Sequence, residues 1–432
     1  MSHRLGSALG ACLLLAACSG PAPGVDAGVD AGTPRPDARA PERDGGSPRP
    51  DASSPPRDAG VVNRDAGPTD DDAGPAPDAG VDAGAPVDGG VDTGPFQIFV
   101  ATDGRDTDPG TRARPIATLE RAHALLMAAR PDRDVEIRIA PGVYVGQAVV
   151  WRYVDPAHTT RFLPRDWTGS GTPTRPVFDG DGARMLFYLN RTSARSGVRT
   201  NLEFHWLHLR DYVVSGITFA SNRDDPAGFS SHNRVEDCVF EDIGNVGGEP
   251  DAGLGGVVLS NTRDSHVLRN TFRRLVNAPG DAGLIHGVYL THNATGNDVS
   301  HNTFRTVSGD PIRVRDASHF NTFHHNTFRN AGEAAVFGDW YCHGRPDCVR
   351  RECPSFGNSL RYSDLGCTGH GGATVPLFYF HHGRACVPSG CPDLFATGES
   401  RLTTAGNALP DTDGDGTPDC SLGPTQPRGS CP

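Results

Sequence analysis

Short runs of alternating hydrophobic and polar residues, separated by polar turns, fill the chain from Phe96 onward. Ile98-Phe99-Val100 is a predicted strand, and residues 135–139 alternate as a second strand that ends before Pro141-Gly142. Between them, residues 115–129 are predicted to form a helix, with Pro115 in the first turn, where its missing N–H costs nothing. Its apolar positions recur at helical spacing: Ile116, Leu119, Ala122, Leu125 and Leu126.

A repeat of strands and turns follows this opening segment. Three copies begin at Gly256, Gly287 and Pro311 and lead, 16 or 17 positions later, to the Phe of an Asn-Thr-Phe-Arg motif at 270–273, 302–305 and 326–329. A small repeat made of strands cannot bury its apolar face alone and must stack on copies of itself. Stacking predicts one column of Asn270, Asn302 and Asn326 and another of Phe272, Phe304 and Phe328, with Cys238 in the Asn position one repeat earlier.

This pattern resembles the right-handed parallel β-helix superfamily, the pectin-lyase-like fold. The segment from Phe99 to Leu119, with Asp108-Pro-Gly-Thr and Pro115-Ile-Ala-Thr-Leu, is also similar to the capped N-terminus of extracellular bacterial members. The resemblance covers about residues 96–340 and implies an all-β solenoid with an N-terminal capping helix. It specifies the fold more than the function, because the same solenoid carries lyases, hydrolases, epimerases and binding proteins.

The resemblance implies that any chemistry occurs in a groove along one sheet, so the outward-facing residues of one sheet are the candidates. Strand alternation places Val257, Val288 and Ile312 inside the solenoid. The outward positions are Val258, Tyr289 and Arg313, followed by Ser260, Thr291 and Arg315. Aligning residues 309–312 with 332–335 puts His286, Asp310 and Glu333 in one column, about 4.8 Å apart from coil to coil, and Asp316 and Asp339 in another.

The candidate catalytic residues are therefore His286, Tyr289, Asp310, Arg313, Arg315 and Glu333. A histidine, two carboxylates, a tyrosine and two arginines could perform general acid–base chemistry on a glycan, and arginine suits the carboxylate of a uronic acid. An enzyme of this kind would be a polysaccharide lyase or epimerase, with Arg313 or His286 as the base and Tyr289 as the proton donor, or a glycoside hydrolase using Asp310 and Glu333. The alternative is a non-catalytic adhesin or envelope scaffold, in which the carboxylates cap turns and the arginines are solvated.

The first 95 residues predict export and attachment. Residues 1–17 have the features of a signal peptide, and Leu15-Ala-Ala-Cys18 resembles the bacterial lipobox, which implies lipidation of Cys18. Ser19 after the cysteine implies sorting to the outer membrane or cell surface. The remainder of residues 18–95 is rich in Asp-Ala-Gly, Gly and Pro, so we expect a disordered tether. No later segment reaches 18 apolar residues, so the lipid would be the only membrane attachment.

Residues 341–432 form a predicted cysteine-rich C-terminal region. Eight cysteines lie between 342 and 431, and in an exported chain such a set predicts up to four disulfides rather than a zinc site, since no Cys-x-x-Cys occurs. The loop from Asp411 to Cys420 places oxygen ligands at the spacing of a calcium loop and looks like a thrombospondin type 3 repeat; the alternative is a solvated acidic turn. The candidate Ca²⁺ ligands are Asp411, Asp413, Asp415, Thr417 and Asp419.

The composition of the chain excludes some classes of binding partner and of chemistry. The net charge is −12, and residues 21–95 hold 15 acidic residues against 6 arginines, which leaves the folded part close to neutral and argues against nucleic-acid binding. The chain contains no lysine, so lysine-dependent chemistry is excluded. We therefore expect a monomeric, lipid-anchored bacterial surface protein whose partner is an acidic polysaccharide.

Overall fold

The computed structural model describes residues 94–247, 253–332, 335–343, 348, 351–372, 377–380, 387–412, 414 and 417–420. The signal peptide, Cys18 and the predicted tether up to residue 93 lie outside this part of the chain, so the lipid anchor stays a prediction. None of the helices within the described ranges has the length and apolarity needed to cross a bilayer.

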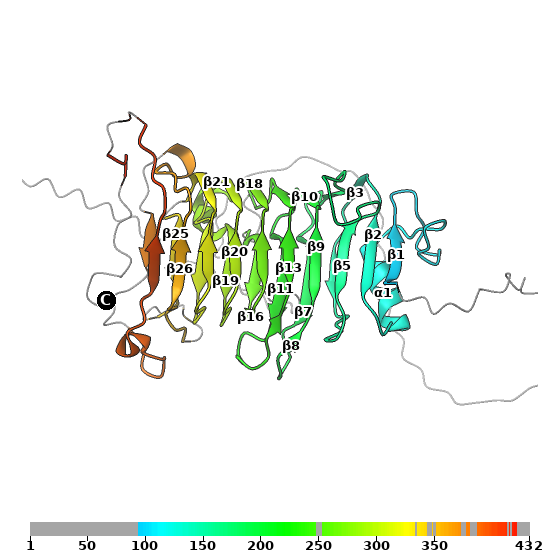
Figure 1. Ribbon diagram of the computed structural model, residues 1–432, viewed down its shortest axis with the longest axis horizontal. Helices are drawn as coiled ribbons and strands as arrows, with labels where there is room; N and C mark the ends of the chain where they lie inside the picture. The colour runs from blue at the N-terminus through cyan, green and yellow to red at the C-terminus, as the bar shows by residue number, and fades with distance from the viewer. Residues whose placement is uncertain are drawn as a thin grey trace, which may run out of the picture. The chain divides into compact units, whose positions relative to one another are not determined.

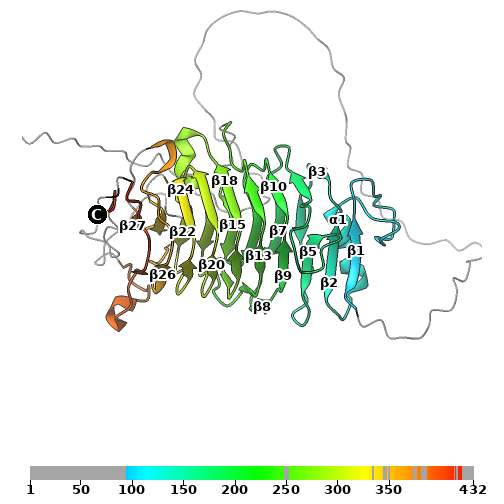
Figure 2. The same ribbon diagram turned by 45° about the horizontal axis from the view of Figure 1, so that its top comes forward.

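Parallel strands form three long sheets, and each coil from β2 to β25 contributes one strand to each sheet in turn (Figures 1 and 2). Sheet A consists of β1 (Phe96–Val100), β2 (Val135–Ile139), β5 (Thr160–Pro164), β9 (Leu202–His205), β13 (Arg234–Glu236), β17 (His266–Leu268), β20 (Asp298–Ser300), β23 (Thr322–His324), β26 (Asn358–Arg361) and β28 (Leu402–Ala405). Sheet B consists of β3 (Val143–Val145), β6 (Val177–Asp179), β10 (His208–Arg210), β14 (Val239–Glu241), β18 (Thr271–Leu275), β21 (Thr303–Val307) and β24 (Thr327–Ala331). Sheet C consists of β4 (Val149–Trp151), β7 (Met185–Arg191), β11 (Ser215–Ser221), β15 (Gly255–Ser260), β19 (His286–Thr291), β22 (Ile312–Arg315), β25 (Phe337–Trp340) and β27 (Phe378–Phe380). Three short strands, β8 (Val198–Arg199), β12 (Ser230–Ser231) and β16 (Thr262–Arg263), form a further small sheet.

The N-terminal end of the stack is closed by helix α1 (Leu119–Ala129), which packs against β1 and β4. It begins four residues later than predicted because Thr118 is its N-cap: the Thr118 hydroxyl accepts a hydrogen bond from the Arg121 N–H at 3.1 Å. Pro115 therefore precedes the helix. Leu119, Ala122 and Leu126 are the buried face, so the predicted capping helix and the strands on either side of it in sequence are confirmed.

A ladder of asparagine side chains joins successive coils at the corner between sheets A and B. The Asn302 Oδ1 atom accepts hydrogen bonds from the backbone and side chain of Asn270, and Asn302 donates in turn to Asn326 Oδ1 at 3.2 Å. The Cys238 N–H donates to Asn270 Oδ1 at 2.9 Å, so Cys238 occupies the predicted position. A second ladder of Asn297, Asn321 and Asn358 runs along sheet A at the strand starts, which the sequence reading missed.

The predicted phenylalanine column is also present. Phe272, Phe304 and Phe328 stack with ring centroids 4.9 and 5.0 Å apart and nearly parallel planes, and Phe240 extends the stack by one coil. The glycines that begin two of the repeats make room for these rings: a Cβ at Gly256 would lie 2.6 Å from the Phe272 ring, and a Cβ at Gly287 would lie 2.3 Å from the Phe304 ring. The phenylalanine ring therefore packs in the space that the missing side chain of the glycine leaves.

The stack continues beyond residue 340, where the sequence reading placed its end. Strands β26 and β28 extend sheet A, and β27 extends sheet C. Three disulfides brace this end, between Cys342 and Cys348, Cys353 and Cys391, and Cys367 and Cys420. The cysteine-rich region is thus partly the last coils of the solenoid itself.

The register of β25 corrects one predicted column. Ile312 pairs with Phe337, an offset of 25 residues, whereas the sequence alignment assumed 23. Asp339 therefore aligns with Val314, faces the interior, and does not share an outward column with Asp316. Inside the last coils, the fully buried Asp339 accepts a 2.6 Å hydrogen bond from Nε of Arg401, which is also fully buried.

We predict that Asn302→Ala lowers the free energy of unfolding by about 3 kcal/mol or more, because it removes four hydrogen bonds and leaves buried partners unsatisfied. The measurement is guanidinium unfolding followed by circular dichroism. Arg305→Ala, an exposed substitution three residues away, is the control and should change stability by less than about 0.5 kcal/mol. Equal stability of the two variants would contradict a structural role for the ladder.

We predict that Arg401→Met destabilises the fold increasingly as pH rises. Burial raises the pKa of the Asp339 carboxyl from 3.8 to about 6, and the Arg401 guanidinium opposes this rise. Because the folded state binds this proton more tightly than the unfolded state, the Asp339 contribution to stability already falls as pH rises from 3.8 to about 6. Without Arg401, the Asp339 contribution to stability keeps falling at higher pH. The variant should therefore be only slightly less stable than the wild type near pH 4, and less stable by about 3–5 kcal/mol at pH 8.

Thermal unfolding of the wild type and Arg401→Met between pH 4 and pH 8 measures this difference. The double substitution Asp339→Asn, Arg401→Met removes the buried charge and should recover most of the loss at pH 8. A loss that is independent of pH, or no recovery in the double variant, would show that the ion pair does not control stability here.

Candidate functional site

The candidate site lies on the outward face of sheet C, over strands β19, β22 and β25. Strand alternation was predicted correctly: Val288 and Ile312 lie in the core, while Tyr289 and Arg313 pair with each other on the outward face. The next outward pair is Thr291 and Arg315. The register of the coils thus brings four of the predicted residues to one face.

His286 and Asp310 lie on adjacent coils at the start of these strands. The His286 Nδ1 atom is 2.8 Å from the carbonyl oxygen of Asp310. A carbonyl can only accept, so Nδ1 carries the proton and the neutral ring presents an unprotonated Nε2. Burial, and secondly the nearby Arg313 charge, holds the pKa of His286 well below its ordinary value. His286, which is 3% exposed, is therefore a neutral imidazole with an unprotonated Nε2 at neutral pH.

Both oxygens of the Asp310 carboxylate accept hydrogen bonds from neighbouring residues. Its Oδ2 accepts a 2.7 Å ion-paired hydrogen bond from Arg313, and its Oδ1 accepts from the Ala335 N–H at 2.8 Å. Gly338 is required beside this pair, because a Cβ there would lie 2.1 Å from Asp310 Oδ2. Ala335, and not Glu333, corresponds to Asp310 in the observed register; Glu333 itself lies outside the described residues.

Arg315 is the centre of a second polar group. Glu352 accepts two hydrogen bonds from its guanidinium, at 2.8 and 2.7 Å, and the Tyr289 hydroxyl accepts a third at 3.3 Å. The guanidinium also lies over the Trp340 ring, 4.5 Å from its centroid. Burial alone would lower the pKa of Arg315, but Tyr289 and the paired Glu352 carboxylate together hold it well above its ordinary value. Each arginine is thus held in an ion pair, Arg313 with Asp310 and Arg315 with Glu352. The role of Arg313 as a base remains a prediction.

The sequence analysis did not identify Glu352 and His292 as members of this site, and it named Asp316 only as the partner of Asp339 in a column. Glu352 lies between Cys348 and Cys353 in a segment without a repeat motif. His292 and Asp316, on adjacent coils, form a buried pair with His292 Nδ1 2.9 Å from Asp316 Oδ2. With Glu352 they form a group of three buried ligand-type side chains whose ligand atoms lie within 4.8 Å of one another. The Arg315 pairing already neutralises Glu352, so this group is better suited to an internal ion-pair network than to a metal.

The predicted calcium loop is described only in part, because Asp413 and Asp415 lie outside the described residues. Asp411 Oδ1 accepts a hydrogen bond from the Gly414 N–H at 2.9 Å, and Asp419 Oδ1 accepts from the Thr412 N–H at 3.3 Å. These contacts fold the loop back on itself. Calcium binding by the five predicted ligands remains a prediction.

Comparison with known proteins agrees with the architecture. The sequence model of the family described as "Right handed beta helix region" matches residues 206–343. A solved rhamnogalacturonan lyase is similar, with 15% identity and a TM-score of 0.39, over 67% of this chain and 73% of that chain. Pectate lyase Pel9A is similar with 12% identity and a TM-score of 0.37, over 76% of this chain and 81% of that chain.

A further similar structure is a mannuronic-acid-specific polysaccharide family 6 lyase from human gut microbiota, with 12% identity and a TM-score of 0.28 over 70% of each chain. A comparison with curated protein sequences found no match. The family match and the stacked parallel sheets identify the fold as a right-handed parallel β-helix. The solved structures resemble this chain in fold alone, so the function must be argued from the site.

Proposed function

We propose that this protein is a carbohydrate-binding β-helix whose sheet C face, from His286 to Trp340, recognises an acidic polysaccharide and acts on it as a lyase or epimerase. The observation that carries the proposal is that three functional groups lie next to one another on this face. An unprotonated histidine, a tyrosine hydroxyl and a fixed guanidinium lie side by side: the His286 and Tyr289 ring centroids are 5.0 Å apart, and the Tyr289 hydroxyl is 3.3 Å from Arg315.

These groups match the needs of β-elimination from a uronic acid. His286 Nε2 would take the proton from C5 as the C5–H bond breaks, and Arg315 would stabilise the negative charge that develops on the uronate carboxylate. Tyr289 would give its proton to the glycosidic oxygen as the C4–O bond breaks and the C4–C5 double bond forms. Transfer of the Tyr289 proton to the other face of C5 instead would give epimerisation.

Two buried hydrogen-bonding groups on this face support ligand binding. The Arg313 Nε and the Thr291 hydroxyl are buried and find no hydrogen-bond partner within the described residues. A buried donor without a partner costs free energy, and a bound sugar hydroxyl or carboxylate would satisfy it. Hydrolysis by a pair of carboxylates is less well supported, because both oxygens of Asp310 already accept hydrogen bonds.

The N-terminal residues complete the proposal. Lipidation at Cys18 and an acidic tether would hold the β-helix at the outer membrane or cell surface as a monomer, where an exported chain would meet polysaccharides.

We predict that the purified protein produces the ultraviolet absorbance of a 4,5-unsaturated uronate with one of a panel of uronic-acid polysaccharides. His286→Asn should lower the rate at least 100-fold, because its amide can still donate to the Asp310 carbonyl but has no base nitrogen. Tyr289→Phe, which removes only the hydroxyl, should lower it by a similar factor. Exchange of the C5 proton with ²H₂O, followed by NMR, detects epimerisation in the same samples.

Arg305→Ala, on sheet B, is the control and should keep wild-type activity. New reducing ends without the absorbance would point to hydrolysis and overturn the lyase assignment. If no substrate is turned over or bound by the wild type, the non-catalytic scaffold becomes the better description of the protein.

A further inference from the structure

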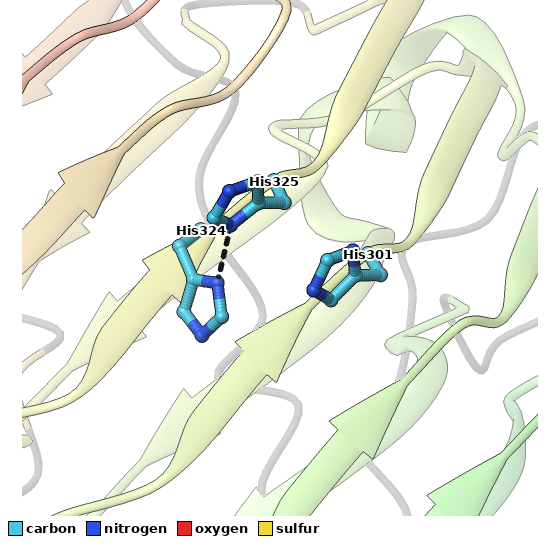
Figure 3. A group of neighbouring side chains, drawn as sticks. All are labelled: His301, His324 and His325. Carbon is cyan, nitrogen blue, oxygen red and sulfur yellow. Dashed lines mark hydrogen bonds between the residues drawn. The ribbon is translucent and has the colours of Figure 1, made fainter.

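Three histidines gather at the corner between sheets A and B, away from the strands of the sheet C site (Figure 3). His324 is the last residue of β23 and His325 follows it; His301 follows β20 on the preceding coil. Their ligand nitrogens lie within 4.8 Å of one another. The sequence shows only the His324-His325 pair, because the third member is 23 positions earlier.

The alignment of successive coils brings these histidines together. Asn302 and Asn326, each next to a histidine of the cluster, are joined in the asparagine ladder, so His301 and His325 occupy equivalent corner positions. Both have left-handed backbone conformations, with φ of 57° and 53°, like the other residues of this corner column. Their rings stack 4.8 Å apart at 10°, which is the spacing of the coils themselves. The buried amide ladder therefore fixes the backbone from which two of the three rings project.

Asp298 orients the third ring. The Asp298 Oδ2 atom is 3.3 Å from Nε2 of His324, while Nδ1 of His324 is 2.8 Å from Nδ1 of His325. A carboxylate that holds one imidazole nitrogen, so that the other faces a shared point, is the arrangement that surrounds zinc-binding histidines. The Asp298 Oδ1 atom is buried and has no hydrogen-bond partner among the described residues.

We propose that His301, His324 and His325 bind one divalent transition-metal ion, of which zinc is the representative, with Asp298 as the orienting partner of His324. Imidazole nitrogens favour zinc, copper and nickel over calcium or magnesium. Tetrahedral zinc with Zn–N bonds near 2.05 Å separates its ligand nitrogens by about 3.3 Å, so the rings need only small side-chain rotations to reach it. His301 and His325 are exposed, which leaves the rings free to move and the site open to solvent.

The charge around the cluster is compatible with a cation. Arg269, the corner residue on the preceding coil, is paired with Glu236 and Asp237, which offset its charge. Three protein ligands leave a fourth position for water or an oxygen of a bound molecule. This inference is independent of the proposed polysaccharide chemistry.

The test is zinc titration of the full chain after treatment with EDTA, in calcium-containing buffer, by isothermal titration calorimetry. We expect the double variant His301→Ala, His325→Ala to bind one zinc equivalent fewer than the wild type. Asp298→Asn should retain the site but weaken it about tenfold, because the amide orients His324 less strongly. Cobalt added in place of zinc should give tetrahedral d–d absorption in the wild type and lose it in the double variant.

His232→Ala changes an exposed histidine between β12 and β13, outside this cluster; it is the matched control and should bind zinc like the wild type. Equal melting temperatures in EDTA establish that the variants are folded, as expected for exposed positions. The proposal is overturned if the wild type binds no zinc, or if the double variant binds zinc with the same stoichiometry and affinity as the wild type.

Discussion

The hydrogen bonds between stacked asparagine amides are the constraint on which the other features of this solenoid depend. Each amide accepts from the coil before it and donates to the coil after it, so a slip by one residue would break the ladder on both sides at once. The ladder holds the corner fixed while loop lengths vary, with 32 residues between Asn270 and Asn302 and 24 between Asn302 and Asn326. Asparagines that are separated by different numbers of residues therefore stack at the same distance from one coil to the next.

This constant step explains which parts of the fold the sequence could predict. The Asn and Phe columns repeat at a fixed distance from a recognisable strand, so their stacking followed from spacing alone, as did the inward and outward faces of β15, β19 and β22. At β25 the preceding turn contains two more residues than the alignment assumed. No further Asn-Thr-Phe motif follows β25, so no spacing to a later motif revealed that Asp339 faces inward.

The candidate site was predictable in its positions but not in its chemistry. Periodicity placed Tyr289, Arg313 and Arg315 outward correctly. Periodicity could not reveal that Arg313 is paired with Asp310 and Arg315 with Glu352. Both acidic residues are only 1% exposed. Those pairs bear on the proposed chemistry: an arginine that is held by a buried carboxylate is a fixed cation, so His286 is the residue that we propose as the base.

Glu352 also links the site to the C-terminal end of the solenoid. It reaches Arg315 from a segment that the Cys342–Cys348 and Cys353–Cys391 disulfides hold, and its Oε2 accepts a further hydrogen bond from the Cys342 N–H at 2.8 Å. The cysteine-rich region therefore does more than close the stack, because it supplies the counter-charge that orients Arg315 toward Tyr289. A purely protective cap would need no such contact. The last coils and the sheet C face thus form one structural unit, while the histidine cluster depends only on the coil register at the opposite corner of the repeat.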